Sequence, residues 1–189
     1  MKLQAPIQFY LAGFLAFSAV SASAAELRRG AAEIEFQGTS TLHDFSGTAK
    51  TEPFDVLAEP DGGAMIVSGT ATVAVARFDT RHARRDENMR KMFDAARFPF
   101  ATGTLESARI DPAGDSSATL ALTIRDRTFR VPATIRNART EDGAIRFDLD
   151  LVLSLREIGL APPVLLGVIR VGDRVPVRVR VALDKAPEN

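Results

Sequence analysis

Apolar and polar residues alternate at two-residue spacing over long stretches of this chain, a pattern that few folds accommodate. In residues 145–153 and 175–183 every odd position is apolar, and the even positions between them include several Asp and Arg residues. Residues 129–135 follow the same rule. Successive side chains of a β-strand point to opposite faces, so each stretch predicts a strand with one dry and one wet face.

Further strands and one helix complete the predicted architecture. Residues 118–136 predict a β-hairpin, and shorter alternating runs predict strands from position 34, over 69–75 and over 101–105. Residues 81–93 contain no Gly or Pro and carry apolar residues at helical spacing, which predicts one short helix. One short helix cannot cover a sheet of about eight strands, so the sheet must close on itself as a barrel or sandwich. We therefore expect a mainly β protein.

The N-terminal residues differ from the rest of the chain. A lysine at position 2 precedes an apolar stretch, 7–20, and a run of small residues, 21–25. This order is typical of a cleaved signal peptide. The apolar stretch is short for a bilayer span, and no later segment approaches the roughly 20 apolar residues that a span needs. We expect residues 1–24 to be a signal peptide and residues 25–189 to form one domain.

Composition excludes several kinds of chemistry. The chain has no Cys and no Trp, and its one tyrosine, Tyr10, lies in the expected signal peptide. Without thiols there is no disulfide framework and no cysteine-containing zinc site. Basic and acidic side chains number 24 each, and nucleic-acid binding needs a basic face. We therefore expect no nucleic-acid partner.

The two histidines, His43 and His82, are the remaining candidates for metal or acid–base chemistry. Their spacing matches no metal-binding motif, so we expect no metal site and no cofactor. His43 lies within residues 40–44, where hydroxyls, an imidazole and a carboxylate adjoin, but neighbouring strand residues point to opposite faces. No G-x-S-x-G motif occurs either. We expect no catalytic residue and no enzyme; a hydrolase that uses His43 is the weakest alternative.

The segment around the expected helix carries a specific pattern. It reads Phe78-Asp79-Thr80, then Arg85-Asp86-Glu87-Asn88-Met89-Arg90, then Phe93-Asp94 and Arg97-Phe98-Pro99. This order resembles the signature of the YceI-like family, which reads Ile-Asp-Thr, Arg-Asp-x-x-(Leu/Met)-Arg, Phe-Asp and (Lys/Arg)-(Tyr/Phe)-Pro. Residues 122–125 resemble that family's Leu-Thr-Ile-(Arg/Lys) hairpin, and residues 172–175 resemble the start of its last strand. The resemblance covers nearly all of residues 25–189.

The resemblance implies a lipocalin-like antiparallel β-barrel of about eight strands with one short helix. It also implies a periplasmic protein that binds a polyisoprenoid chain, of the quinone or polyprenyl phosphate class, in an elongated apolar pore. The expected partner is thus an isoprenoid or other long-chain lipid. We expect no stable membrane span, and the sequence leaves homodimer formation open.

Whether the barrel is hollow stays open on the residues alone. Small inward residues such as Gly69, Ala71 and Gly103 either leave volume for a ligand or let the strands bend. A hollow barrel would bind, sequester or transport a lipid without chemistry, whereas a filled one would be a structural or stress-response interaction domain without a ligand. In the hollow barrel we expect the cavity to be lined by Phe36, Ala71, Val73, Met89, Met92, Phe93, Phe98, Gly103, Leu122, Val131, Phe147, Leu149, Leu151 and Val177.

Three polar residues are candidates for contact with a lipid head group: His43, Arg81 and Arg85. A guanidinium matches phosphate geometry through two parallel hydrogen bonds, and both arginines flank the start of the expected helix. The alternative for Arg85 is a salt bridge with Asp79 or Asp94. The alternative for His43 is an ordinary structural or surface role.

Overall fold

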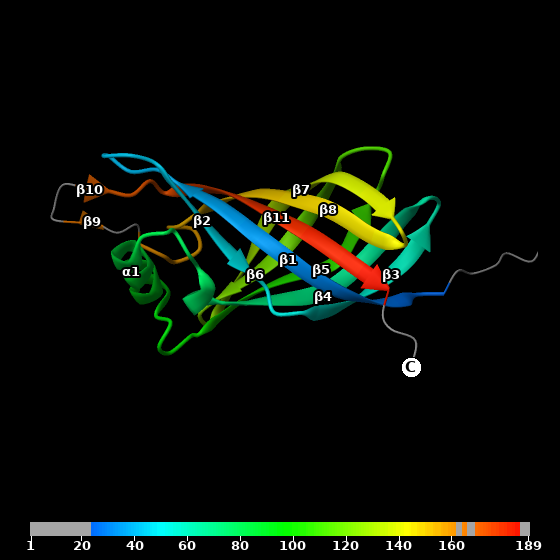
Figure 1. Cartoon of the computed structure of the whole chain (residues 1–189), viewed down its shortest axis with the longest axis horizontal. Helices are drawn as coiled ribbons and strands as arrows, with labels where there is room; N and C mark the ends of the chain where they lie inside the picture. Colours follow the sequence, from blue (N-terminus) through cyan, green and yellow to red (C-terminus); the bar gives the residue numbers. More distant parts are fainter. Residues whose placement is uncertain (1–23, 162–163, 166–168, 186–189) are drawn as a thin grey trace, which may run out of the picture.

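Strands make up most of the structure, a computed structural model that describes residues 24–161, 164–165 and 169–185 (Figure 1). The predicted signal peptide, 1–24, falls outside these residues except at its last position. The strands are β1 (Glu26–Gly38), β2 (Phe45–Lys50), β3 (Phe54–Asp61), β4 (Ala64–Ala74), β5 (Phe100–Ile110), β6 (Ser116–Ile124), β7 (Arg127–Glu141), β8 (Ala144–Ser154), β9 (Val164–Leu165), β10 (Ile169–Arg170) and β11 (Arg174–Lys185). A single 3-10 turn, η1 (Val75–Arg77), and one helix, α1 (Ala83–Phe93), accompany them in the described part.

Nine of these strands form one antiparallel sheet that closes into a barrel. Closure comes from β11, which pairs with β8 on one side and with β1 on the other. Both β2 and β3 pair with the same edge of β1, β3 along its first half and β2 along its second half, so together they fill one position in the wall. The barrel therefore has eight strand positions, and the predicted lipocalin-like fold class is confirmed.

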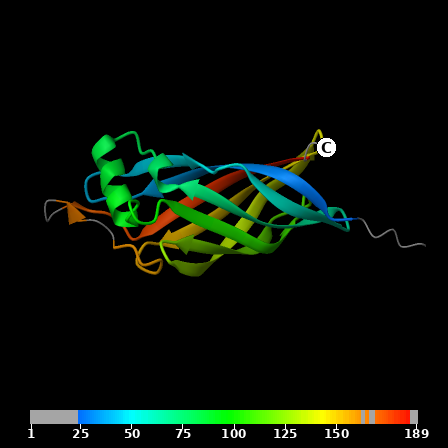
Figure 2. The same ribbon diagram turned by 90° about the horizontal axis from the view of Figure 1, so that it is seen from below.

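Helix α1 lies across one end of the barrel, beside the small β9–β10 sheet (Figures 1 and 2). It begins at Ala83 rather than at the predicted position 81 because Arg81 adopts a left-handed φ of 58° and His82 is extended. It ends at Phe93 as predicted, since Asp94 takes the left-handed conformation that often terminates helices. The predicted helix is therefore present but one half-turn shorter.

A buried carboxylate fixes the start of α1. Thr80 donates two hydrogen bonds to Asp86 Oδ1, from its backbone N–H at 2.9 Å and from its hydroxyl at 2.5 Å. Burial of Asp86 opposes ionisation, but these hydrogen bonds and the charges of Arg90 and Arg85 outweigh burial and lower the pKa of Asp86. The ionised carboxylate thus ties the segment before the helix to its first turn.

We expect Asp86→Ala to lower the free energy of unfolding by about 1–3 kcal/mol, because the buried Thr80 donors lose their acceptor. Since folding lowers the pKa of Asp86, this contribution is present above the unfolded pKa of about 3.9 and is lost as the pH falls through the folded value. Urea titrations of the unchanged protein and of Asp86→Ala at neutral pH and at about pH 3 measure the difference between their free energies of unfolding. This difference should be smaller at about pH 3. Glu87→Ala, which removes an exposed ion pair with Lys91, should change little. Equal effects of the two variants would contradict this role.

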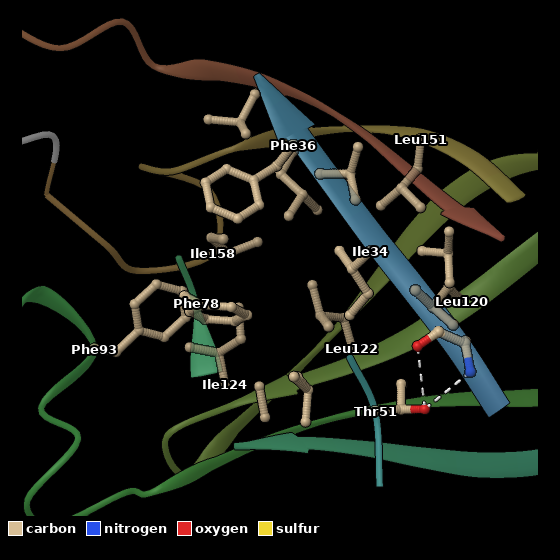
Figure 3. A pocket seen from close by; sticks show the side chains of 18 of the residues that line it. Ile34, Phe36, Thr51, Phe78, Phe93, Leu120, Leu122, Ile124, Leu151 and Ile158 are labelled. Carbon is tan, nitrogen blue, oxygen red and sulfur yellow. Dashed lines mark hydrogen bonds between the residues drawn. The ribbon is translucent and has the colours of Figure 1, made fainter. Parts of the chain in front are cut away.

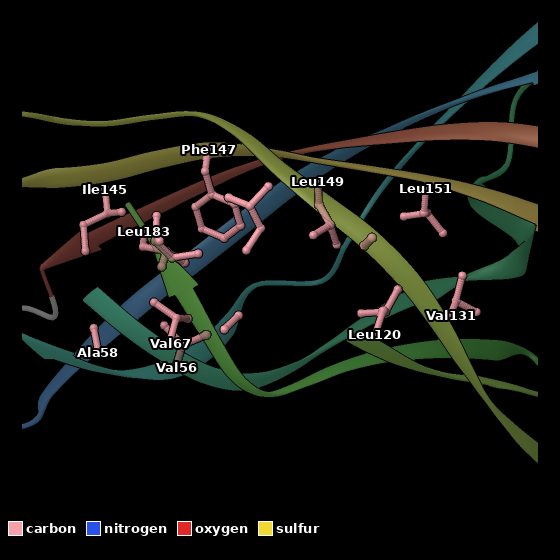
Figure 4. Packing of buried hydrophobic residues seen from close by; sticks show 14 residues of the cluster. Val56, Ala58, Val67, Leu120, Val131, Ile145, Phe147, Leu149, Leu151 and Leu183 are labelled. Atoms are coloured by element: carbon pink, nitrogen blue, oxygen red, sulfur yellow. The ribbon is translucent and has the colours of Figure 1, made fainter. Parts of the chain in front are cut away.

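The interior is packed at both ends of the barrel. A smaller buried cluster that includes Ile124, Leu155 and Leu160 packs against Met92 and Phe93 of α1, and a larger one lies at the other end. Side chains from β3, β4, β5, β8 and β11 meet there in an apolar cluster, much of which Figure 4 shows. We call this region the closed end and define it by five residues that are at most 3% exposed, Ala58, Val67, Ile110, Ile145 and Leu183. It lies opposite α1, so the two ends of the barrel differ in structure.

Candidate functional site

A cavity of about 510 Å³ occupies the interior of the barrel between α1 and the closed end. Inward side chains of β1, β4, β5, β6, β8 and β11 form its wall. Along β11 the inward Val177, Val179 and Val181 are only half-buried, although their outward neighbours are the ones in solvent. These valines line the cavity and also pack against the buried cluster of the closed end. The cavity thus reaches the closed end, where Val67 and Leu183 line it and also belong to the buried cluster.

Three phenylalanine rings narrow the cavity near α1 (Figure 3). Phe78 follows η1, and its ring centroid lies 5.9 Å from that of Phe36 on β1 and 5.3 Å from that of Phe93 at the end of α1. The rings meet edge-on or tilted, arrangements that aromatic pairs prefer. The segment from η1 to α1 is thus joined to the barrel wall through an apolar contact that also borders the cavity.

Glycines on β1 and β2 let aromatic rings lie flat across the strands. Phe36 pairs directly with Gly47, and a Cβ added at Gly47 would lie 2.2 Å from the Phe36 ring. Phe45 lies in the same way over Gly38. A ring that covers a cross-strand glycine replaces the missing side chain in the packing. These glycine–phenylalanine pairs could not be predicted from the sequence because they depend on the strand register.

The cavity reaches solvent at the α1 end, through an opening that we call the mouth. Its rim consists of Ser40, Leu42 and His43 from the β1–β2 connection and of His82, Arg84, Arg85 and Asn88 from α1 and the residue before it. Leu42, His43, His82 and Arg84 are exposed as well as cavity-lining. Among the described residues that line the cavity none is acidic, so cationic and neutral polar groups surround the opening of an apolar interior.

Arg85 is held in place at the mouth. Its Nε donates to the Thr80 hydroxyl and its Nη2 to the Thr80 carbonyl, each at 2.8 Å, while its guanidinium lies 4.4 Å from the centre of the Phe45 ring. Neither Asp79 nor Asp94, the alternative partners considered from the sequence, forms an ion pair with it among the described residues. Arg85 thus joins α1 to β2 and borders the cavity at the same time.

His43 is exposed at the mouth, and its position does not build a catalytic triad. The hydrogen bond from the Ser40 hydroxyl, at 2.7 Å, goes to the backbone carbonyl of His43 and not to its ring. The same hydroxyl accepts from the backbone N–H of His43 at 3.2 Å. Ser40 therefore stabilises the turn of the β1–β2 connection rather than acting as a nucleophile beside the imidazole.

Most residues expected to line a cavity lie at its wall, but three site candidates do not. The residues placed at the wall are Phe36, Ala71, Val73, Met89, Met92, Phe93, Gly103, Leu122, Phe147, Leu149, Leu151 and Val177, and His43 and Arg85 lie at the mouth. Val131 points inward but is packed into the buried cluster of Figure 4. Phe98 lies in the turn after α1, with the Arg97 guanidinium 4.9 Å from its ring centre. Arg81 is exposed before the helix, where its backbone N–H donates to Asp79 at 2.7 Å.

Several residues that line the cavity were not predicted from the sequence to do so. Phe78 is part of the family signature but lies outside the predicted helix, and Ile158 lies in the turns after β8, where no periodicity exists. Arg84 and Asn88 can be assigned to the mouth only once the orientation of α1 over the mouth is known. Ile34 and Val175, by contrast, belong to the alternating stretches and extend the predicted inward set.

No group of three His, Asp or Glu side chains in the described part of the chain is arranged to hold a metal ion. No helix within residues 24–161, 164–165 and 169–185 is long and apolar enough to cross a membrane. Besides the mouth residues, Thr51 and Thr102 are the polar residues that the structure places at the cavity.

Comparison with known proteins places this fold among solved relatives. A family model described as a YceI-like domain matches residues 18–183. The crystal structure of BcnA from Burkholderia cenocepacia is similar at a TM-score of 0.61 and 20% identity, over 79% of this chain and 95% of that one. A polyisoprenoid binding domain from Saccharophagus degradans has a TM-score of 0.53 at 12% identity, over 86% of this chain and 100% of its own.

A third solved structure, the YCEI protein of Campylobacter jejuni, has a TM-score of 0.55 and 17% identity, over 75% of this chain and 85% of that one. No curated protein matches the chain. At these identities the solved structures support the fold, while the family model covers most of the sequence.

Proposed function

Because the chain belongs to the YceI-like family, we propose that it binds an isoprenoid-type lipid, of the quinone or polyprenyl phosphate class, in the barrel cavity. In this proposal the protein sequesters or transports the lipid and performs no chemistry on it. The observation that carries the proposal is the apolar cavity of about 510 Å³, whose charged and imidazole side chains lie at one mouth. The polyisoprenoid-binding description of the Saccharophagus degradans domain supports the same ligand class.

The chemistry of the wall suits a hydrocarbon chain. Valine, leucine, isoleucine and phenylalanine side chains dominate it, and the hydroxyl of Thr51 is already bonded to the backbone of Ala32 (Figure 3). Each methylene that moves from water into such a cavity contributes about 0.8 kcal/mol. A methyl-branched chain therefore gains affinity along its length, while a polar substrate would find few partners inside.

The position of the polar residues gives the ligand a direction. A chain that fills the cavity has its tail toward the closed end and its head group at the mouth, beside His43 and Arg85. A guanidinium or an imidazole can hydrogen-bond either a phosphate or a quinone carbonyl. We further propose that residues 1–24 direct export, so that the lipid is bound in the periplasm.

Mass spectrometry of organic extracts from natively purified protein tests this function. We expect a lipid with an isoprenoid tail at a substantial fraction of one molecule per protein, and we expect the emptied protein to take up a polyprenyl phosphate or a quinone in titrations. Protein that is repeatedly empty and binds neither lipid would favour the other reading, an interaction domain without a ligand. Turnover of the bound lipid would contradict the absence of chemistry.

A further inference from the structure

We propose that the mouth docks on the surface of an anionic lipid bilayer, with Leu42 entering the interface and Arg84 facing the lipid head groups. The proposal rests on the proposed function in one respect, since a bilayer is where an isoprenoid lipid would be collected or delivered. It adds the surface through which the exchange takes place.

The direction of exchange follows from the two ends of the barrel. At the closed end Leu183 and Ala58 are 0% exposed, and the cluster around them leaves no opening among the described residues. At the other end the rim residues are exposed and line the cavity together. A lipid that enters along the barrel axis therefore passes the mouth, and the bilayer must face it.

Leu42 is presented to solvent at that rim. It is 66% exposed, more than any other large apolar residue in the described part of the chain. The connection that carries it is braced, because Ser40 bonds to His43 and the Thr41 N–H donates to the Arg170 carbonyl at 3.1 Å. Its exposure is thus fixed by the turn, and it is unfavourable in water unless an apolar phase receives the side chain.

The charges at the mouth differ from those on the barrel wall. On the wall, Arg178 pairs with Asp150 and Arg180 with Glu35, each through two hydrogen bonds. Arg84 is exposed and forms no direct ion pair or side-chain hydrogen bond with another described residue, although its charge, after the hydrogen bond from Lys91, helps to lower the pKa of Glu87. An exposed cation without a direct hydrogen-bonded partner, beside an exposed leucine, matches a membrane surface that has anionic head groups outside and hydrocarbon inside.

Acidic residues near the rim do not cancel this charge. Asp44 is the acidic residue of the Leu42 connection, Asp79 accepts from the Arg81 N–H, and Glu87 pairs with Lys91 at 2.6 Å. None of the three lines the cavity opening. The surface that a bilayer would meet around the opening thus includes Leu42, Arg84 and the two histidines, with the exposed Asp44 next to His43.

Vesicle sedimentation tests the proposal. We expect the protein to bind vesicles that contain phosphatidylglycerol, to bind pure phosphatidylcholine vesicles poorly, and to be released by salt. Arg84→Ala should weaken binding about fivefold, the effect of one cation near an anionic surface. Leu42→Asp should weaken it about tenfold or more, because it puts a charge into the interface.

The chain offers a matched control for each variant. Leu57→Asp changes another exposed leucine, on the outer face of β3, and Arg130→Ala changes an exposed arginine that pairs with Glu106 on the outer face of β7. Both controls should bind like the unchanged protein. Equal binding by all four variants, or no binding of the unchanged protein to either vesicle, would overturn the docking surface.

The lipid content of the same proteins separates this proposal from the proposed function. Extracts that hold an isoprenoid lipid from a protein that ignores vesicles would overturn docking and leave lipid binding standing. Empty extracts from a protein that docks through Leu42 and Arg84 would overturn lipid binding and leave the docking surface standing.

Discussion

Ala71→Phe is expected to abolish lipid binding while the barrel still folds. Ala71 points into the cavity from β4 and pairs directly with Gly103 on β5, so two of the smallest side chains of the wall stand next to each other. A phenylalanine at position 71 therefore has free volume to enter and need not displace a packed neighbour. The ring would occupy space that the proposed chain requires.

The size of the effect follows from the hydrocarbon that the ring excludes. One isoprene unit has five carbons, and loss of its burial at about 0.8 kcal/mol per carbon weakens binding by about 4 kcal/mol, close to a thousandfold in Kd. Mass spectrometry of extracts and titration of the emptied protein measure it. Ala31→Phe, at an exposed outward position of β1, is the control and should bind normally. Unchanged lipid content in Ala71→Phe would show that the ligand lies elsewhere.

The sequence predicted the faces of the strands but not the depth of each residue in the barrel. Alternation assigned Val131 and Val177 correctly to the inward face, yet Val131 is packed and Val177 borders the cavity. The difference depends on how strands from distant parts of the chain cross, as where β1 pairs with β11. A periodic pattern of apolar residues does not show how far along the barrel each inward residue lies.

The positions and contacts of the residues around the helix depend on local backbone conformation. Arg81 was expected at the helix start, but its left-handed φ places it before the helix and away from the cavity. Arg85 was expected to contact a head group or, in the alternative, to pair with Asp79 or Asp94, and its donors go to Thr80 rather than to either aspartate. The family signature located this segment correctly because the signature is local, while the roles of its arginines depend on a turn that the pattern does not specify.

Truncation of leucines should distinguish the packed from the hollow part of the barrel. Leu183 at the closed end is 0% exposed, so Leu183→Ala leaves a void among fixed neighbours and should lower the free energy of unfolding by about 2–5 kcal/mol. Leu122 on β6 is half-buried and borders the cavity, where part of its surface has no packed neighbour to lose. In protein freed of lipid we therefore expect Leu122→Ala to lower it by less than about 2 kcal/mol.

Bound lipid should reduce this difference, because the ligand supplies the neighbours that Leu122 otherwise lacks. A lipid that binds only the folded state raises its stability, so loaded protein unfolds at a higher urea concentration. In loaded protein, Leu122→Ala loses contacts with the lipid as well as with the cavity wall. Leu183→Ala should depend less on lipid than Leu122→Ala does, since Leu183 is 0% exposed and packed in the buried cluster, although it also lines the inner end of the cavity. Urea titrations of emptied and loaded protein measure all four values. Equal losses for both leucines in emptied protein would mean that the middle of the barrel is as tightly packed as its closed end.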